Sequence, residues 1–92
     1  MRVIIVGAGE VGFHIARRLA AENKDVAIID QNPEVLTRVS ERLDVETVLG
    51  SGSSPKVLET AGVKSAEILL AVTDSDEINL IACTFSNILA PN

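Results

Sequence analysis

Residues 3–12 read VIIVGAGEVG, four branched aliphatic residues followed at once by a glycine-rich turn. The aliphatic run is typical of a strand that is buried on both faces of a parallel sheet. Gly7, Gly9 and Gly12 then match the pattern G-x-G-x-x-G, in which a strand passes through a tight turn into a helix whose amino terminus binds phosphate. The stretch therefore predicts a strand, a phosphate-binding turn and a helix in succession.

Three more aliphatic runs follow, and each is succeeded by a segment of helical period. Asn32-Pro33 and Ser54-Pro55 each place a capping side chain before a proline at the first helical position. Strands are expected at 3–6, 26–29, 45–49 and 68–72, and helices at 10–22, 33–43, 55–61 and about 75–89. Right-handed crossovers then predict an α/β fold, a doubly wound, Rossmann-like parallel sheet in the order 3-2-1-4 with helices on both faces.

The composition fits one small, folded domain. The chain has 92 residues, 47% apolar and 23% charged, with a net charge of −5. The eight basic residues are scattered along the chain, which argues against nucleic acid as a partner. The single cysteine, Cys83, excludes an internal disulfide and indicates a reducing compartment. Because no apolar run reaches the roughly 20 residues of a membrane span and no secretory signal precedes the first strand, we expect a soluble, cytoplasmic protein.

Each glycine of the turn has an expected task. Gly7 makes the tight turn, Gly9 lets a phosphate approach the backbone, and Gly12 lets the helix sit close to the sheet. Asp30 ends the second expected strand, 18 positions beyond Gly12, where its carboxylate can accept hydrogen bonds from ribose hydroxyls. A carboxylate there repels a 2′-phosphate, so NAD is favoured over NADP, while the ribose of ATP, ADP or AMP would satisfy it equally.

The remaining candidate site residues belong to the turn itself or follow the other strands. Because the carboxyl ends of parallel strands meet at one edge of the sheet, we expect all of them to lie around one crevice. They are Ala8, Glu10 and Val11 in the turn, Gln31 after the second strand, Gly50 and Ser51 after the third, and Val72, Thr73 and Asp74 after the fourth. Glu10 is expected to point into solvent, because a carboxylate beside a phosphate would repel it.

Two of these loops have more than one interpretation. The loop at residues 50–54 either closes around the adenine or a ribose, or is a flexible connection that ends in the Ser54 cap. The acidic residues at 74–77 suggest a metal, but acids in the first turn of a helix, which the helix dipole favours, explain them better. We therefore expect no metal site.

No catalytic residues are expected. His14 and Cys83 are the only histidine and cysteine, and neither has a partner at metal-ligand or nucleophile–base spacing. A binding module that is not an enzyme is the first interpretation. The alternative is the cofactor-binding half of an NAD-dependent dehydrogenase that lacks its substrate domain, which would need a catalytic His, Lys or Tyr.

Four segments in order, MRVIIVGAGEVG at 1–12, DQNP at 30–33, GSGSSP at 50–55 and AVTDSDEIN at 71–79, resemble the bacterial TrkA family. Its repeating module is the RCK or KTN domain, and the resemblance covers essentially the whole chain. It implies the amino-terminal RCK domain of a regulator that binds NAD(H) or an adenine nucleotide and controls the gating of a Trk potassium-uptake channel. Residues 7–11 would then line the phosphates, Asp30 would hold the adenosine ribose, and Thr73 and Asp74 would border the crevice.

The resemblance also carries expectations about the longer protein. The chain ends at Asn92, where the family continues into further strands, so we expect a fragment whose affinity comes mainly from the adenosine and pyrophosphate side. The fourth strand would be left as an edge, which favours a dimer. The full-length regulator would lie at the inner face of the cell membrane, bound to its channel subunit.

Overall fold

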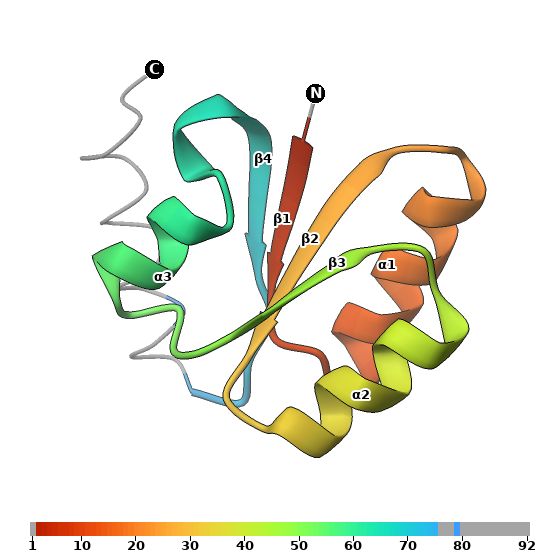
Figure 1. Ribbon diagram of the computed structural model, residues 1–92, viewed down its shortest axis with the longest axis horizontal. Helices are drawn as coiled ribbons and strands as arrows, with labels where there is room; N and C mark the ends of the chain where they lie inside the picture. The colour runs from red at the N-terminus through yellow and green to blue at the C-terminus, as the bar shows by residue number, and fades with distance from the viewer. Residues whose placement is uncertain (1, 76–78, 80–92) are drawn as a thin grey trace.

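The computed structural model describes residues 2–75 and residue 79, and within them strands alternate with helices (Figure 1). The elements are β1 (Arg2–Val6), α1 (Glu10–Ala21), β2 (Asp25–Asp30), α2 (Pro33–Arg42), β3 (Glu46–Leu49), α3 (Pro55–Thr60), the 3-10 helix η1 (Val63–Ser65) and β4 (Ala66–Ala71). Each expected element within this part of the chain is present, with bounds shifted by at most two residues. Most of the fourth expected helix, Asp76 and Glu77 of the acidic cluster, and Cys83 lie outside the described residues.

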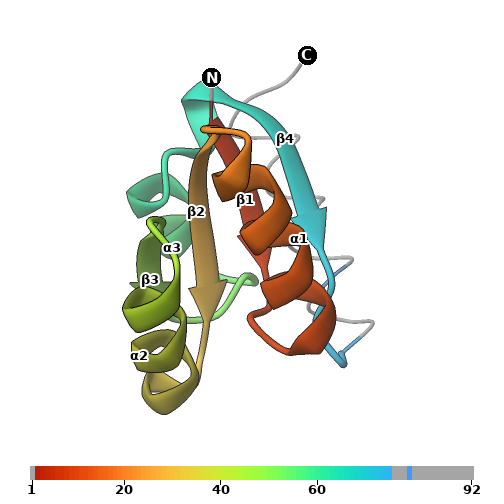
Figure 2. The same ribbon diagram turned by 90° about the vertical axis from the view of Figure 1, so that its right-hand side faces the viewer.

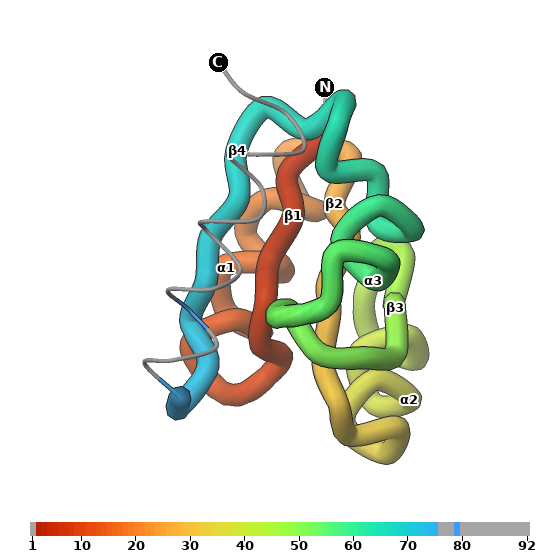
Figure 3. The backbone as a smooth tube through the Cα atoms, turned by 90° about the vertical axis from the view of Figure 1, so that its left-hand side faces the viewer, coloured from red at the N-terminus to blue at the C-terminus, as the bar shows by residue number. Residues whose placement is uncertain are grey.

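The strands form one parallel sheet in the order β3-β2-β1-β4, which confirms the predicted α/β topology. Val3 of β1 pairs with Val26 of β2 on one side and with Ile68 of β4 on the other. Helices α1 and α2 cover one face of the sheet, and α3 covers the other (Figures 2 and 3). The order places the carboxyl ends of β1 and β4 side by side at the point where the crossovers change direction, which is where such sheets bind ligands.

The two central strands supply both halves of the core. Alternate residues of β1 and β2 point to opposite faces, and residues 3–6 and 26–29 are fully or almost fully buried. The α3 side contains Ile4, Val6, Ala27, Ile29, Val48, Leu58, Ala61 and Val63. The α1 and α2 side contains Val3, Ile5, Ala8, Ala16, Val26, Ile28, Leu36 and Val39. Burial of each large aliphatic side chain contributes about 1.5–3 kcal/mol, so these strands stabilise the fold and fix the sheet edge.

The outer strands differ from the sequence prediction. We expected all four strands to be buried on both faces, but Leu49 in β3 is 59% exposed and Ile68 in β4 is 47% exposed. Glu46 and Glu67 are also exposed. The reason is position: β3 and β4 end the sheet among the described residues, so fewer side chains cover them.

The predicted helix caps are confirmed. Asn32 Oδ1 accepts a hydrogen bond from the backbone N–H of Glu34 at 2.9 Å, and Ser54 Oγ accepts one from Val57 N–H at 3.3 Å. Gly62, which follows the C-cap residue Ala61 of α3, adopts the left-handed conformation with φ of +91°. The short helix η1 that follows it has no counterpart in the sequence prediction.

Arg2 joins three strands and a loop at the end of the sheet opposite the crevice. Its guanidinium donates to both carboxylate oxygens of Asp25, at 3.1 and 3.2 Å, to Glu46, and to the carbonyl oxygen of Ala61 at 3.0 Å. The hydrogen bonds to Asp25 and then to Glu46 hold the pKa of Arg2 above its ordinary value. This stabilisation is therefore fully present below the ordinary pKa of arginine and is lost only in strongly alkaline solution.

We expect Arg2→Gln to lower the free energy of unfolding by about 1–2 kcal/mol, because a bidentate pair, a second carboxylate partner and a part-buried carbonyl partner are lost together. Lys64→Gln is the control, since the Lys64–Glu59 pair is exposed and 3.9 Å long, and it should change the value by less than about 0.5 kcal/mol. Urea denaturation of both variants measures the difference. If both substitutions lowered the free energy of unfolding equally, the Arg2 contacts would stabilise the fold no more than an ordinary surface ion pair does.

Candidate functional site

The glycine turn between β1 and α1 is closely packed at two of its three glycines. Gly7 has φ of +112°, and a Cβ there would lie 3.0 Å from the carbonyl group of Val72. A Cβ on Gly12 would overlap the carbonyl oxygen of Gly7. The first turn of α1 therefore packs directly on the residue that follows β1, at the end of that strand. The nearest side chain, that of Val72, would be 3.4 Å away.

Gly9 is the open position of the turn. It is exposed, and a Cβ there would meet nothing within 4 Å, so the backbone can be approached from outside as the phosphate-binding role requires. Gly9 is also the N-cap of α1, and no side chain caps that helix. Its first-turn N–H groups thus remain able to bind an anion.

Glu10 and Val11 begin α1 with their side chains exposed, Val11 by 56%. Glu10 is therefore open to solvent, and it also lines a pocket between α1 and α2.

Asp30 connects the end of β2 to the glycine turn. Its Oδ2 accepts a hydrogen bond from Ala8 N–H, and its Oδ1 accepts one from Asn32 N–H, both at 2.8 Å. Its own carbonyl oxygen accepts from Gly50 N–H at 2.9 Å. The carboxylate therefore lies on the same side of the sheet edge as the turn. Each carboxylate oxygen has a second lone pair, so it can still accept from a hydroxyl group.

A pocket of about 230 Å³ lies at this edge of the sheet. It is lined by Val6, Ile29, Asp30, Gln31, Gly50, Gly52, Thr73, Asp74 and Ser75. Five of the candidate residues, Asp30, Gln31, Gly50, Thr73 and Asp74, are thus brought together, from the ends of β2, β3 and β4.

The other candidates do not line this pocket. The turn residues from Gly7 to Gly12 lie beside it and are connected to it through the Ala8–Asp30 hydrogen bond. Val72 packs into the core on the α1 side. The hydroxyl of Ser51 bonds within its own loop, 2.7 Å from the hydroxyl of Ser53 and 3.1 Å from Ser53 N.

Gly52 is a pocket residue that the sequence analysis did not select. It is buried, and a Cβ there would overlap the side chain of Val6. The loop after β3 therefore packs against Val6 at the end of β1. The same loop ends at Ser54, the predicted N-cap of α3. The second glycine of the G-S-G sequence was the only signal available for this contact.

Asn79 was also missed, and it fixes the loop after β4. Its Oδ1 accepts from Thr73 N–H at 3.0 Å and lies 2.6 Å from the Thr73 hydroxyl, and its Nδ2 donates to the Thr73 carbonyl oxygen at 3.1 Å. Ser75 N–H in turn donates to the Thr73 hydroxyl at 3.1 Å. These bonds hold the Thr73–Ser75 wall of the pocket in one conformation.

The described part of the chain offers neither a metal site nor a membrane span. Residues 2–75 and 79 contain no group of three or more His, Cys, Asp or Glu side chains arranged to hold a metal ion. None of the helices described has the length and apolar character to cross a membrane. His14 is exposed and makes an edge contact with Phe13, with ring centroids 6.0 Å apart.

The sheet order, the glycine turn and the crevice together define a Rossmann-like α/β domain, a class of protein that holds its ligand at the carboxyl edge of the sheet. Comparison with known protein families narrows this class to one family. The chain belongs to the TrkA-N domain family, whose model matches residues 3–92. This confirms the resemblance that the sequence indicates.

Individual proteins that resemble the chain bear the name of the same family. The chain is 51% identical over 83 residues to the Trk system potassium uptake protein TrkA of Azorhizobium caulinodans, which is 90% of this chain and 18% of that protein. It spans about a fifth of the length of the curated relatives it matches.

Solved structures show the same fold. The TrkA-N domain of the Escherichia coli inner membrane protein ybaL has a TM-score of 0.89 at 20% identity, over 98% of this chain and 66% of that one. Shewanella denitrificans Kef CTD, solved in an AMP-bound form, has a TM-score of 0.83 at 26% identity, over 99% of this chain and 53% of that one.

Proposed function

We propose that the chain is the adenine-nucleotide-binding module of a Trk-type potassium-uptake regulator, with NAD(H) as the preferred ligand and ATP, ADP or AMP as the other candidates. The phosphates would lie on the first turn of α1, at Gly9, Glu10 and Val11. The adenosine ribose would bind Asp30, and the adenine would occupy the pocket at the carboxyl edge.

One observation carries the proposal. The Asp30 carboxylate, the open Gly9 backbone and the pocket lie within one connected arrangement, because Asp30 binds Ala8 N–H at 2.8 Å and also lines the pocket. A nucleoside phosphate needs these three features together: an acceptor for ribose hydroxyls, N–H groups for phosphate, and a cavity for the base. The AMP-bound form of a relative that shares 26% identity supports the same ligand class.

The regulatory role follows from this ligand. A nucleotide that binds one arrangement of the full-length regulator more tightly than another shifts the population between them, and a channel attached to the regulator responds. No reaction on the nucleotide is required, so the proposal assigns no catalytic residue. It places the module in the cytoplasm, at the inner face of the membrane through its channel subunit, as a homodimer built on the β4 edge.

Isothermal titration calorimetry of the 92-residue chain with NAD, NADH, ATP, ADP, AMP and NADP tests the proposal. We expect NADP to bind at least about tenfold more weakly than NAD, because its 2′-phosphate would lie against the Asp30 carboxylate. Equal affinity for NADP and NAD would remove the ribose role of Asp30. If no adenine nucleotide bound, the proposed function would be wrong.

A further inference from the structure

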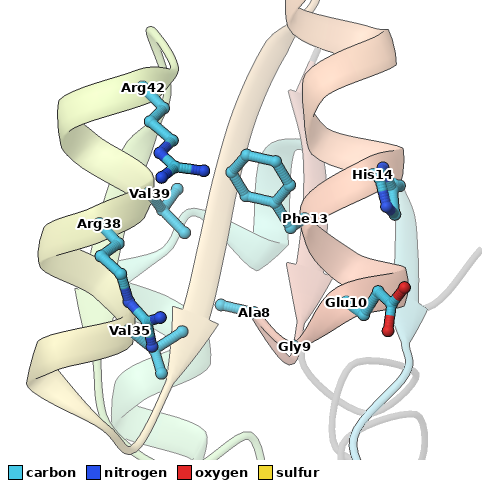
Figure 4. Close-up of a pocket in the computed structure, with 9 residues that line it drawn as sticks. All are labelled: Ala8, Gly9, Glu10, Phe13, His14, Val35, Arg38, Val39 and Arg42. Carbon is cyan, nitrogen blue, oxygen red and sulfur yellow. The ribbon is translucent and has the colours of Figure 1, made fainter.

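A second pocket, of about 250 Å³, lies between α1 and α2 (Figure 4). It shares no lining residue with the pocket at the carboxyl edge. Its walls come from the end of the glycine turn and the first turns of α1 on one side, and from α2 on the other. Gly9 and Glu10, where the proposed nucleotide site holds phosphate, also line this pocket, but Phe13 and the α2 residues have no part in that site.

The floor of this second pocket is apolar. Ala8 is 4% exposed and Val39 is 1% exposed, and the half-buried Phe13 and Val35 pack against the same core. In Figure 4 the Phe13 ring projects from α1 into the space between the two helices. A ligand with an apolar body would cover the exposed parts of Phe13 and Val35 and remove them from water.

The rim of the pocket is cationic. Arg38 and Arg42 stand one helical turn apart on α2 and are exposed. Neither forms a hydrogen bond or ion pair with any residue that the structure describes, whereas Arg2 and Arg18 are both paired. In Figure 4 the Arg42 guanidinium points toward the Phe13 ring. Glu10 also lines the pocket, from the α1 side, so two arginines face one carboxylate and the lining keeps an excess of positive charge. The two positive charges are therefore available to an anion in the pocket.

We propose that the pocket between α1 and α2 binds a small organic anion, an aryl or alkyl phosphate monoester, with its apolar body on Phe13, Val35 and Val39. Guanidinium groups match phosphate oxygens with pairs of N–H donors, and both arginines can reach one ligand from the same helix face. The ring of an aryl ester would meet Phe13 in an edge or offset contact. This inference goes beyond the nucleotide site and does not depend on it.

Phenyl phosphate is the probe, and its binding is followed through the backbone amide resonances of the 92-residue chain by NMR titration. We expect shifts at Phe13, Val35 and Val39. The double variant Arg38→Gln/Arg42→Gln should weaken binding by about tenfold or more, because both charged donors are lost. Arg17→Gln is the matched control, an exposed arginine of α1 outside the pocket, and should leave the affinity unchanged.

Two further titrations identify the site and the ligand class. Inorganic phosphate should bind at least several-fold more weakly than phenyl phosphate, since it leaves the apolar floor uncovered. Saturating adenosine, which carries no phosphate, should not displace the probe, and this holds whether or not adenosine binds at the other pocket.

Several results would overturn the proposal. In the NMR titration, these are a spectrum in which no lining residue shifts, or shifts that are confined to the first turn of α1 and persist in the double variant. In the affinity measurements, they are an equal loss of binding in Arg17→Gln, equal affinity for inorganic phosphate and phenyl phosphate, or displacement of phenyl phosphate by adenosine. Because Arg38 and Arg42 are exposed and unpaired within the described residues, the variants should keep the native amide spectrum away from the pocket. That spectrum separates lost binding from lost folding.

Discussion

Replacing Gly12 with alanine is expected to lower the free energy of unfolding by about 3 kcal/mol or more. Alanine is a better helix former than glycine by about 1 kcal/mol, so helix propensity alone predicts the opposite sign. The added Cβ, however, would overlap the carbonyl oxygen of Gly7, an atom of the backbone. Gly7 cannot move away freely, because its own Cβ position is 3.0 Å from the Val72 backbone. Overpacking against backbone on both sides therefore outweighs the helical gain.

Gly9→Ala is the matched control, since it makes the same chemical change in the same turn. Nothing lies within 4 Å of its Cβ position, and its φ of −71° suits any residue. We expect a loss below about 1 kcal/mol, the cost of alanine at an N-cap. Urea denaturation of both variants gives the comparison. Similar losses at the two positions would contradict the close packing of Gly12 on Gly7.

Asp30→Ala is expected to weaken the binding of adenine nucleotides by about 1–3 kcal/mol, or roughly 5- to 150-fold, through loss of charge-assisted hydrogen bonds to ribose. This effect rests on the proposed function. The substitution also removes the acceptor for Ala8 N–H, so the glycine turn loses one of its attachments. Asp30→Asn, which keeps one acceptor oxygen without the charge, should give an intermediate affinity.

Calorimetric titration measures these affinities, and Asp44→Ala is the control because Asp44 is exposed after α2 and does not line the pocket. Amide spectra and urea denaturation show that each variant is folded under the conditions of the titration. An Asp30→Ala variant that is folded and binds NAD as well as the original chain would place Asp30 outside the site.

The sequence determined the elements and their order. The aliphatic run from Val3 to Val6, the proline caps at Asn32 and Ser54, and the spacing from Gly12 to Asp30 depend on residues that lie within one element or at its ends. Periodicity and capping act over a few residues, so they can be interpreted without knowledge of the tertiary structure. Right-handed crossovers then limited the sheet to the order that the structure has.

The tertiary structure alone decided how these elements touch. It showed that Gly12 packs on Gly7, that Gly52 packs on Val6, and that Asn79 holds the Thr73 loop. It also showed that α1 and α2 enclose a pocket with Arg38 and Arg42 at its rim, neither of them paired with a residue that the structure describes. Each of these contacts depends on the angle and distance between segments that pack together, which the local pattern of either segment does not record. The periodicity of a segment indicates which face of the element each side chain occupies. The residues that this side chain contacts are determined by the packing of the whole sheet and its helices.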